Sequence, residues 1–506
     1  MVSLTNTILL ILSITGSSGL ISSPPVHHIR TPARWTSTSH LFSRTDGGSS
    51  ASASEDDDAN TGRTKTTVAS QAALTDADAN TGRTKTTVAS QAALIAGTTI
   101  GGGFLALPAA TAPGGALPSA VGLVAVWTYL LGCSLSFANA IFLMKDNIKI
   151  EGTQTSTKDD EISIFSLVRE CYGNIAGFLT GVLFLLLIKA TLVAQLSKAG
   201  VLLQNNIPFA YFNRGVWTIL FSLIVTAVCL VGGKLHIERV NDVLTSTMLL
   251  SFATLVALAS KSGWTIDGLR RANYKCLFPR ESPWAVPIFI QLLLYNEVVP
   301  LVSSRLGDFK KVSRAIVFGS SIPLLMCLIW SCVALGIVPY EPALAATSGS
   351  AIYDPLSRLS QRVMSRGGPI GKIFLTSLNT MAGSAICTTV FGSILATTQY
   401  LDDVIATSFR ARKDSSWTKI FKHAFAVFPS AMIAALGSSE LYYHATAFAG
   451  EFPCTFLFGL IPPLCNLRLR WKRKEKGEAT PLKEVTVQIF LASVSVTILA
   501  ACRRLR

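Results

Sequence analysis

The sequence predicts an all-α membrane protein that crosses the bilayer about eleven times, each crossing needing roughly 20 apolar residues. Half of the 506 residues are hydrophobic, only 14% are charged, and the mean hydropathy is +0.46. Long apolar stretches alternate with short polar loops, as expected of helices that traverse a membrane. Many of the cations behind the net charge of +15 gather in those loops, which argues against a nucleic-acid partner.

The N-terminal part of the chain reads as a presequence rather than as part of the bundle. Residues 1–22 resemble a signal segment, because their apolar core is too short to span a bilayer. Residues 23–86 form a polar, transit-like tail with a tandem repeat, in which 58–74 recurs exactly as 78–94. We expect a transmembrane domain over 87–502, and the signal-plus-transit pattern favours a plastid envelope or another endomembrane.

Eleven apolar segments qualify as spans, each with few or no charges in its interior. They cover residues 87–112, 115–144, 174–203, 214–232, 238–260, 284–303, 312–338, 370–403, 418–437, 442–466 and 483–502. The first and the sixth differ from the others because each is interrupted by residues that disfavour a continuous helix.

The first span is interrupted at Ala96–Pro108, AGTTIGGGFLALP, and we expect the break over Gly97–Gly103. Each glycine in a helix costs about 1 kcal/mol relative to alanine. Unwound backbone survives in a bilayer only where protein buries it or where it lines a cavity. The glycines therefore indicate either a solute site or a small-residue surface where helices pack closely.

The sixth span carries the second interruption, Leu294–Pro300, with Asn296, Glu297 and a proline inside an apolar run. The two interrupted spans occupy equivalent places in two successive groups of five. Interrupted helices placed in this way are typical of transporters built from inverted repeats, with a binding site near the bilayer midplane. We therefore predict a five-plus-five inverted repeat.

Two ionisable residues lie within spans, where charges are costly and usually functional. Glu297 is in the sixth span and Lys189 lies at the middle of the third. They could neutralise each other as a structural pair. Alternatively, both could lie at the central site, with Glu297 as a gate or proton carrier and Lys189 as its partner.

The eighth span has hydroxyl side chains at helical spacing, which could face the site or simply bond to their own backbone. They are Ser377, Thr380, Ser384 and Thr388. The ten cysteines are scattered, with no spacing typical of a metal site, and we expect neither a metal nor a cofactor. No catalytic triad, phosphate-binding loop or carboxylate pair is present, so we expect no enzyme activity.

The stretch AGTTIGGGFLALP resembles the opening signature of the tryptophan/tyrosine permeases, also called the hydroxy/aromatic amino acid permease family. Support comes from Arg239–Asp242, from Tyr295–Pro300 continuing to Ile316, and from Ala449–Gly450 with Ile461–Pro463. The resemblance covers about residues 90–470 and is strongest to the plastid tyrosine-specific transport protein-like members of plants and algae. Glu297 and Lys189 depart from the neutral residues usual in that family.

This resemblance implies a LeuT-type fold and proton-coupled symport of amino acids, most of all tyrosine and tryptophan. The substrate-binding residues that it and the two interruptions suggest are Gly97, Thr98, Thr99, Gly101, Gly102, Tyr295, Asn296 and Glu297. The expected partners are a small amino acid, protons and the lipid bilayer. Two other functions stay open: transport of another amino acid or an amine, and a transport-silent receptor or scaffold on the same fold.

Overall fold

A computed structural model describes residues 87–150, 162–207, 212–271, 285–338, 355–366, 368–408, 416–475 and 482–504. The expected signal segment, the transit-like tail and the first copy of the repeat lie outside the described residues.

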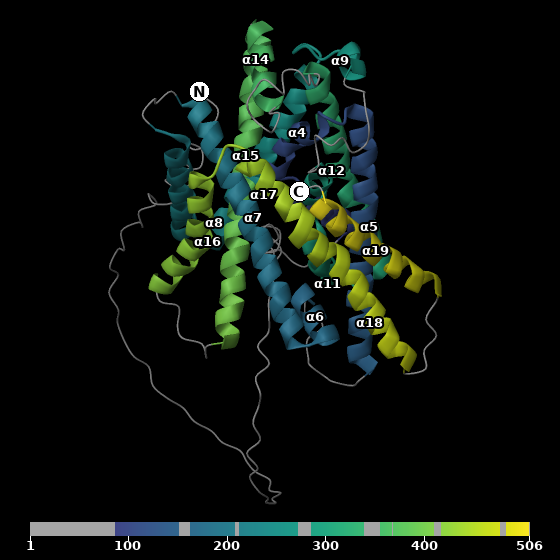
Figure 1. The fold of residues 1–506 in the computed structure, drawn as a ribbon. Coiled ribbons are helices and arrows are strands. Elements are labelled where there is room, and N and C mark those ends of the chain that lie inside the picture. The colour runs from purple at the N-terminus through teal and green to yellow at the C-terminus, as the bar shows by residue number, and fades with distance from the viewer. Residues whose placement is uncertain are drawn as a thin grey trace, which may run out of the picture.

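The described residues form a bundle of helices (Figure 1). In chain order these are α3 (Val88–Thr99), η1 (Gly102–Ala106), α4 (Leu107–Thr111), α5 (Ala116–Ile150), α6 (Ile164–Tyr172), α7 (Asn174–Asn206), α8 (Arg214–Leu258), α9 (Ile266–Arg271), α10 (Ala285–Leu292), η2 (Asn296–Val298), α11 (Val299–Leu306), α12 (Phe309–Ile337), α14 (Pro355–Arg366), α15 (Gly368–Ser408), α16 (Ser416–Leu436), α17 (Leu441–Ala449), η3 (Gly450–Leu460), α18 (Ile461–Glu475) and α19 (Leu482–Arg504). In Figure 1, α9 and α14 lie at one end of the bundle and α6 lies at the other.

The number of membrane spans agrees with the sequence. Ten spans in the described residues are long and apolar enough to cross a membrane, and α3 with η1 and α4 forms an eleventh, bent by 49°. The prediction of an all-α protein with about eleven crossings is confirmed. The fourth and fifth spans count separately, as Arg214–Gly232 and Arg239–Leu258, although the backbone between them stays helical and both belong to α8. The intervening glycines lower helix propensity without blocking the backbone hydrogen bonds, as a proline would.

Burial separates the central spans from the peripheral ones. In the sixth, tenth and eighth spans, 78%, 72% and 67% of the most apolar window is buried inside the protein. For α19 the corresponding share is only 17%, so most of its surface is left to lipid. The sixth, eighth and tenth spans therefore form the interior of the bundle.

The first span stays helical further than the sequence suggests. We expected a break over Gly97–Gly103, but α3 continues through Gly97 and ends at Thr99. The hydroxyls of Thr98 and Thr99 donate to the Ile95 carbonyl at 3.0 and 2.6 Å. One glycine costs too little to stop a helix that is buried on one side. The actual interruption is Ile100–Gly101, after which η1 begins at Gly102.

The sixth span is interrupted where the sequence placed polar residues. Helix α10 ends at Leu292, Leu293–Tyr295 are not helical, and the short turn η2 then leads into α11. Pro300 lies in the first turn of α11, where its missing N–H leaves no hydrogen bond broken. This arrangement gives the chain a short non-helical segment in the middle of a buried span.

The tenth span changes geometry at its middle, where the π-helical segment η3 separates α17 from α18. Gly450 begins this segment against α10, and a side chain there would overlap the Pro287 carbonyl. The Thr455 hydroxyl donates to the Gly450 carbonyl at 2.8 Å. The absence of a side chain at Gly450 thus lets the sixth and tenth spans approach closely.

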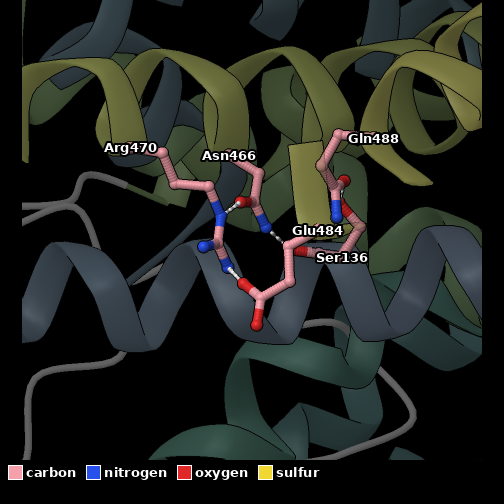
Figure 2. A network of polar contacts seen from close by, with 5 residues as sticks. All are labelled: Ser136, Asn466, Arg470, Glu484 and Gln488. Atoms are coloured by element: carbon pink, nitrogen blue, oxygen red, sulfur yellow. Dashed lines mark hydrogen bonds and ion pairs between the residues drawn. The ribbon is translucent and has the colours of Figure 1, made fainter. Parts of the chain in front are cut away.

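A polar network attaches the peripheral helix α19 to the bundle (Figure 2). Arg470 of α18 forms an ion pair with Glu484 of α19 and donates to Asn466 at 2.7 Å. Asn466 donates to the Ser136 carbonyl of α5 at 3.1 Å, and the Ser136 hydroxyl donates to Gln488 of α19. Because α19 buries little apolar surface, these bonds and packing against η3 hold its position.

Candidate functional site

A cavity of about 180 Å³ lies where the two interrupted spans meet. Its walls come from both interruptions and from α7, α8, α15 and α17. Of the expected substrate-binding residues, seven line it: Gly97, Thr98, Thr99, Gly101, Gly102, Tyr295 and Glu297. Asn296 does not. The polar side chains that also line it are Thr191, Gln195, Asn241, Thr245, Gln291, Thr388, Thr389, Ser393 and Thr446.

Neighbouring spans supply hydrogen-bond partners to the first interruption. The Gly102 N–H donates to the Thr389 hydroxyl of α15 at 2.8 Å. The Tyr442 hydroxyl of α17 donates to the Gly102 carbonyl at 2.7 Å. The Gly102 N–H has no partner within α3 because that helix has ended, and an unpaired buried backbone group costs as much as a lost hydrogen bond. The eighth and tenth spans thus fix the backbone of the first.

The glycines of the first interruption permit close contact with two polar side chains. A Cβ at Gly101 would lie 2.7 Å from the Thr389 hydroxyl, and one at Gly102 would overlap the amide of Gln195. At Gly103 a Cβ would meet only Leu292, at an ordinary 3.5 Å. The requirement for glycine is therefore strongest at Gly101 and Gly102, which explains their presence beside the cavity.

The second interruption carries polar atoms without partners among the described residues. Asn296 is fully buried, and its Oδ1 accepts from the Ser134 hydroxyl at 2.8 Å while its Nδ2 has no partner. The Tyr295 hydroxyl is buried near Ser134 and Ser320 but meets neither with hydrogen-bond geometry. Buried polar atoms without partners are rare, since each carries a desolvation cost.

Glu297 is the one residue with a formal charge among those that line the cavity. Within the described residues the Glu297 carboxylate makes no hydrogen bond and no ion pair. A carboxylate in this position must take a proton or meet a cation that enters the cavity, because an isolated buried charge is strongly disfavoured.

The structure does not bring Lys189 to Glu297, and this expectation is corrected. The Lys189 ammonium donates to the carbonyls of Phe425 and Ala426 on α16 at 2.7 and 2.5 Å. It also lies 4.9 Å from the centre of the Phe425 ring. The long side chain reaches these acceptors on α16, and Lys189 is not among the residues that line the cavity.

The expected hydroxyl stripe of the eighth span reaches the cavity only at its last member, Thr388. The Ser384 hydroxyl is fully buried and donates to the Thr380 carbonyl of its own helix at 2.7 Å. Ser377 and Thr380 are not part of the lining either. The residues of α15 that face the cavity lie around Thr389 and Ser393, further along the helix.

The sequence analysis overlooked a polar pair on α7. Thr191 and Gln195 are one turn apart, and both line the cavity. The Gln291 side chain of α10 donates to the Thr191 hydroxyl at 3.2 Å and accepts from the Cys454 thiol at 2.9 Å. Glutamines inside apolar spans are a detectable signal, because an uncharged amide in a bilayer needs a partner as a carboxylate does.

A second lysine of α7 also escaped the sequence analysis. Lys198 is 4% exposed, and its ammonium lies 5.3 Å from the centre of the Tyr442 ring. The Tyr442 ring thus has a cation on its face while its hydroxyl bonds to Gly102. In the described part of the chain, no cluster of three or more His, Cys, Asp or Glu side chains is placed to hold a metal.

Comparison with known proteins identifies the family, since residues 84–500 match the tryptophan/tyrosine permease family. The chain belongs to this family. This permease is 22% identical to tyrosine-specific transport system 1 of Haemophilus influenzae over 391 residues, which cover 77% of the chain and 89% of that protein. It is 22% identical to the low affinity tryptophan permease of Escherichia coli strain K12 over 362 residues, 69% of the chain and 81% of that protein.

Among solved structures, a Na⁺-coupled sialic acid symporter in a substrate-bound outward-open state is similar to the permease. The TM-score is 0.47 with 12% sequence identity, over 82% of this chain and 89% of that one. The family is one of permeases rather than enzymes, and this chain is an integral, multi-pass membrane transporter. The inverted repeat of five plus five spans stays a prediction.

Proposed function

We propose that this permease is a secondary transporter that carries an aromatic amino acid, tyrosine or tryptophan, together with protons. Membership of the tryptophan/tyrosine permease family and the names of its relatives support the substrate class. The observation that carries the proposal is the cavity between two interrupted spans, with a single carboxylate in its wall. Such interruptions at the bilayer midplane typically bind the polar ends of a transported solute.

In this proposal the two ends of the amino acid meet the two interruptions. The substrate carboxylate lies against the backbone of Gly101–Gly103 and the hydroxyl of Thr99, both in the cavity wall. The substrate ammonium lies against the backbone of the second interruption near Glu297. Tyr295 and Glu297 line that part of the cavity, and the Glu297 carboxylate, which has no hydrogen bond or ion pair among the described residues, can accept a hydrogen bond from the ammonium.

Glu297 is the proposed proton carrier. Because no cation accompanies it in the lining, its charge depends on what the cavity contains. A proton neutralises it when the cavity opens to the more acidic side, and loss of that proton on the other side completes the cycle. Lys189 has no place in this cycle, because its ammonium is already held by the carbonyls of α16.

The direct test reconstitutes the full-length permease in liposomes and measures uptake of labelled tyrosine, tryptophan, alanine, lysine and tyramine. Each is measured with and without an imposed pH gradient. We expect uptake of the aromatic amino acids to rise with the gradient, and the Glu297→Gln variant to lose that rise. If uptake by folded wild-type protein did not depend on the pH gradient, proton coupling would be refuted.

One observation favours a second candidate, transport of a cationic amino acid or an amine. The cavity lining carries one negative charge and no positive one. An extra cation on the substrate would therefore be stabilised by Glu297. In the same assay, preferential uptake of lysine or tyramine would select this candidate over the aromatic amino acids.

We propose the plastid envelope as the membrane in which the permease acts, on the strength of the N-terminal presequence pattern alone. A fluorescent protein fused to the C-terminus, expressed in algal or plant cells, would show envelope fluorescence. Deletion of residues 1–22 should abolish that targeting, and fluorescence retained at the envelope would contradict the signal assignment.

A further inference from the structure

The short helix α6 docks on α18 through three consecutive residues. Lys472 of α18 donates to the Glu170 carbonyl and pairs with the Glu170 carboxylate, each at 3.3 Å. The Cys171 thiol donates to the Cys465 carbonyl at 3.8 Å. The Tyr172 hydroxyl donates to the Leu464 carbonyl at 3.0 Å. These contacts on either side of Cys171 fix its position against α18.

The docking places the Cys171 thiol 3.8 Å from the backbone carbonyl of a second free cysteine, Cys465. Cys171 is 7% exposed and Cys465 is fully buried. A hydrogen bond with Cys465 lowers the pKa of Cys171, and Lys472 and Arg468 act in the same direction, whereas burial and the Glu170 carboxylate oppose them. A thiol with a lowered pKa next to cations is the kind that oxidants attack. Cys171 also keeps a small exposed surface through which an oxidant can reach it.

We propose that Cys171 and Cys465 form an oxidisable thiol pair, which a peroxide converts into a disulfide that ties α6 to α18. The Cys171 thiolate attacks one oxygen of the peroxide, which breaks the O–O bond and leaves Cys171 as a sulfenic acid. The Cys465 sulfur then attacks the Cys171 sulfur. The S–S bond forms, and hydroxide leaves with the Cys465 proton as water. Two thiols and one hydrogen peroxide give one disulfide and two waters.

The disulfide would join two elements that both continue to the cavity. Helix α6 leads directly into α7, which carries Thr191 and Gln195. Helix α18 continues the span of α17, which carries Tyr442 and Thr446. Fixing these two spans to each other restricts any cycle in which they move apart. Slowed uptake is therefore the expected consequence, and this part rests on the proposed transport function.

The experiment treats the full-length permease in liposomes with hydrogen peroxide. Free thiols are then blocked, and the protein is digested and analysed by mass spectrometry. We expect a peptide pair linked through Cys171 and Cys465 that separates on reduction. Uptake of labelled tyrosine, measured in parallel, should fall as the linked fraction rises and should return with dithiothreitol. Neither change should occur in Cys171→Ser or Cys465→Ser.

Cys133→Ser is the matched control. The Cys133 thiol also donates to a backbone carbonyl at 3.8 Å, but that carbonyl belongs to Gly459 and not to a cysteine. This variant should form the disulfide and lose uptake as the wild type does. If wild-type protein treated with excess hydrogen peroxide gave no linked peptide, the proposal that Cys171 and Cys465 form a disulfide would be refuted. A complete disulfide with unchanged uptake would overturn its effect on transport. Absence of uptake before oxidation would refute the transport proposal alone, because the peptide analysis does not depend on it.

Discussion

At the first interruption the surrounding spans supply partners for the freed backbone, whereas at the second several polar atoms lack them. The Gly102 N–H donates a hydrogen bond to Thr389, and the Gly102 carbonyl accepts one from Tyr442. At the second interruption, the Asn296 amide nitrogen and the Tyr295 hydroxyl have no partner among the described residues. The Glu297 carboxylate is also without a bond within that part of the chain.

This difference indicates that the two interruptions have different roles in the cavity. The first interruption is called the first wall, and the second interruption is called the second wall. At the first interruption, the bonds from Gly102 to Thr389 and Tyr442 fix the backbone and so set the shape of the cavity. At the second interruption, the Glu297 carboxylate lines the cavity without a partner among the described residues, and a proton or a cationic ligand can remove the free-energy cost of leaving it unpaired. We therefore expect substitutions in the second wall to change coupling, and substitutions in the first to change the shape of the cavity.

The largest expected effect comes from Glu297→Gln. The amide keeps the size of the side chain but cannot exchange a proton, so uptake driven by a pH gradient should be lost entirely. Exchange of labelled for unlabelled substrate without a gradient should persist, because it needs only binding and reorientation. Both are measured in liposomes. Glu451→Gln is the control, since Glu451 lies in the tenth span and outside the cavity lining. If uptake by Glu297→Gln still depended fully on the pH gradient, the proposed difference in role between the two walls would be refuted.

A smaller loss is expected from Gly102→Ala, which tests whether the first wall is fixed by shape. The added methyl group would overlap the Gln195 amide. Overpacking of this kind costs about 1–3 kcal/mol. Affinity for substrate, measured as the concentration that half-saturates uptake, should therefore weaken without loss of gradient dependence.

Gly103→Ala provides the matched control for this substitution, one residue further along the same segment. Its new methyl group would contact only Leu292, at 3.5 Å, and should leave affinity unchanged. Equal losses from the two alanines would show that helix propensity rather than close contact explains the glycines.

Tyr442→Phe should have a still smaller effect, because it removes one hydrogen bond and keeps the ring on which Lys198 lies. Loss of a single buried hydrogen bond costs about 0.5–1.5 kcal/mol. Substrate affinity should fall by up to about tenfold, since 1.4 kcal/mol is a factor of ten. Tyr129→Phe serves as the comparison, because the Tyr129 hydroxyl bonds to Ser495 of α19, away from the cavity. An unchanged affinity in Tyr442→Phe would mean that the first wall does not need this partner.

The sequence located both interruptions because glycine, proline and charged residues stand out in apolar spans. It could not show which side of each helix faces the cavity. The stripe from Ser377 to Thr388 follows correct helical spacing, yet only Thr388 reaches the lining, because the cavity lies toward one end of the stripe. Gln195 and Gln291 were overlooked because an uncharged amide gives a weaker signal than a carboxylate. Partners on distant spans, such as Tyr442 for Gly102, depend on tertiary packing alone.

The two lysines of α7 also show that the sequence does not give the direction in which a side chain points. One of them, Lys189, leads to the smallest expected effect. Lys189 stood out by its position at the middle of a span, but the structure directs it to the carbonyls of α16 and not to Glu297. Lys189→Met should lower thermal stability, because those carbonyls lose a charged donor, a bond of about 1.5–3 kcal/mol. The gradient dependence of uptake should remain unchanged.

A double-mutant cycle of Lys189→Met with Glu297→Gln tests this directly through thermal unfolding in detergent. If the two residues do not interact, their effects on the free energy of unfolding add within about 0.3–0.5 kcal/mol. A larger coupling energy would mean that Lys189 does neutralise Glu297. In that case the second wall would already have a partner for its carboxylate, and the contrast between the two interruptions would no longer explain where the proton binds.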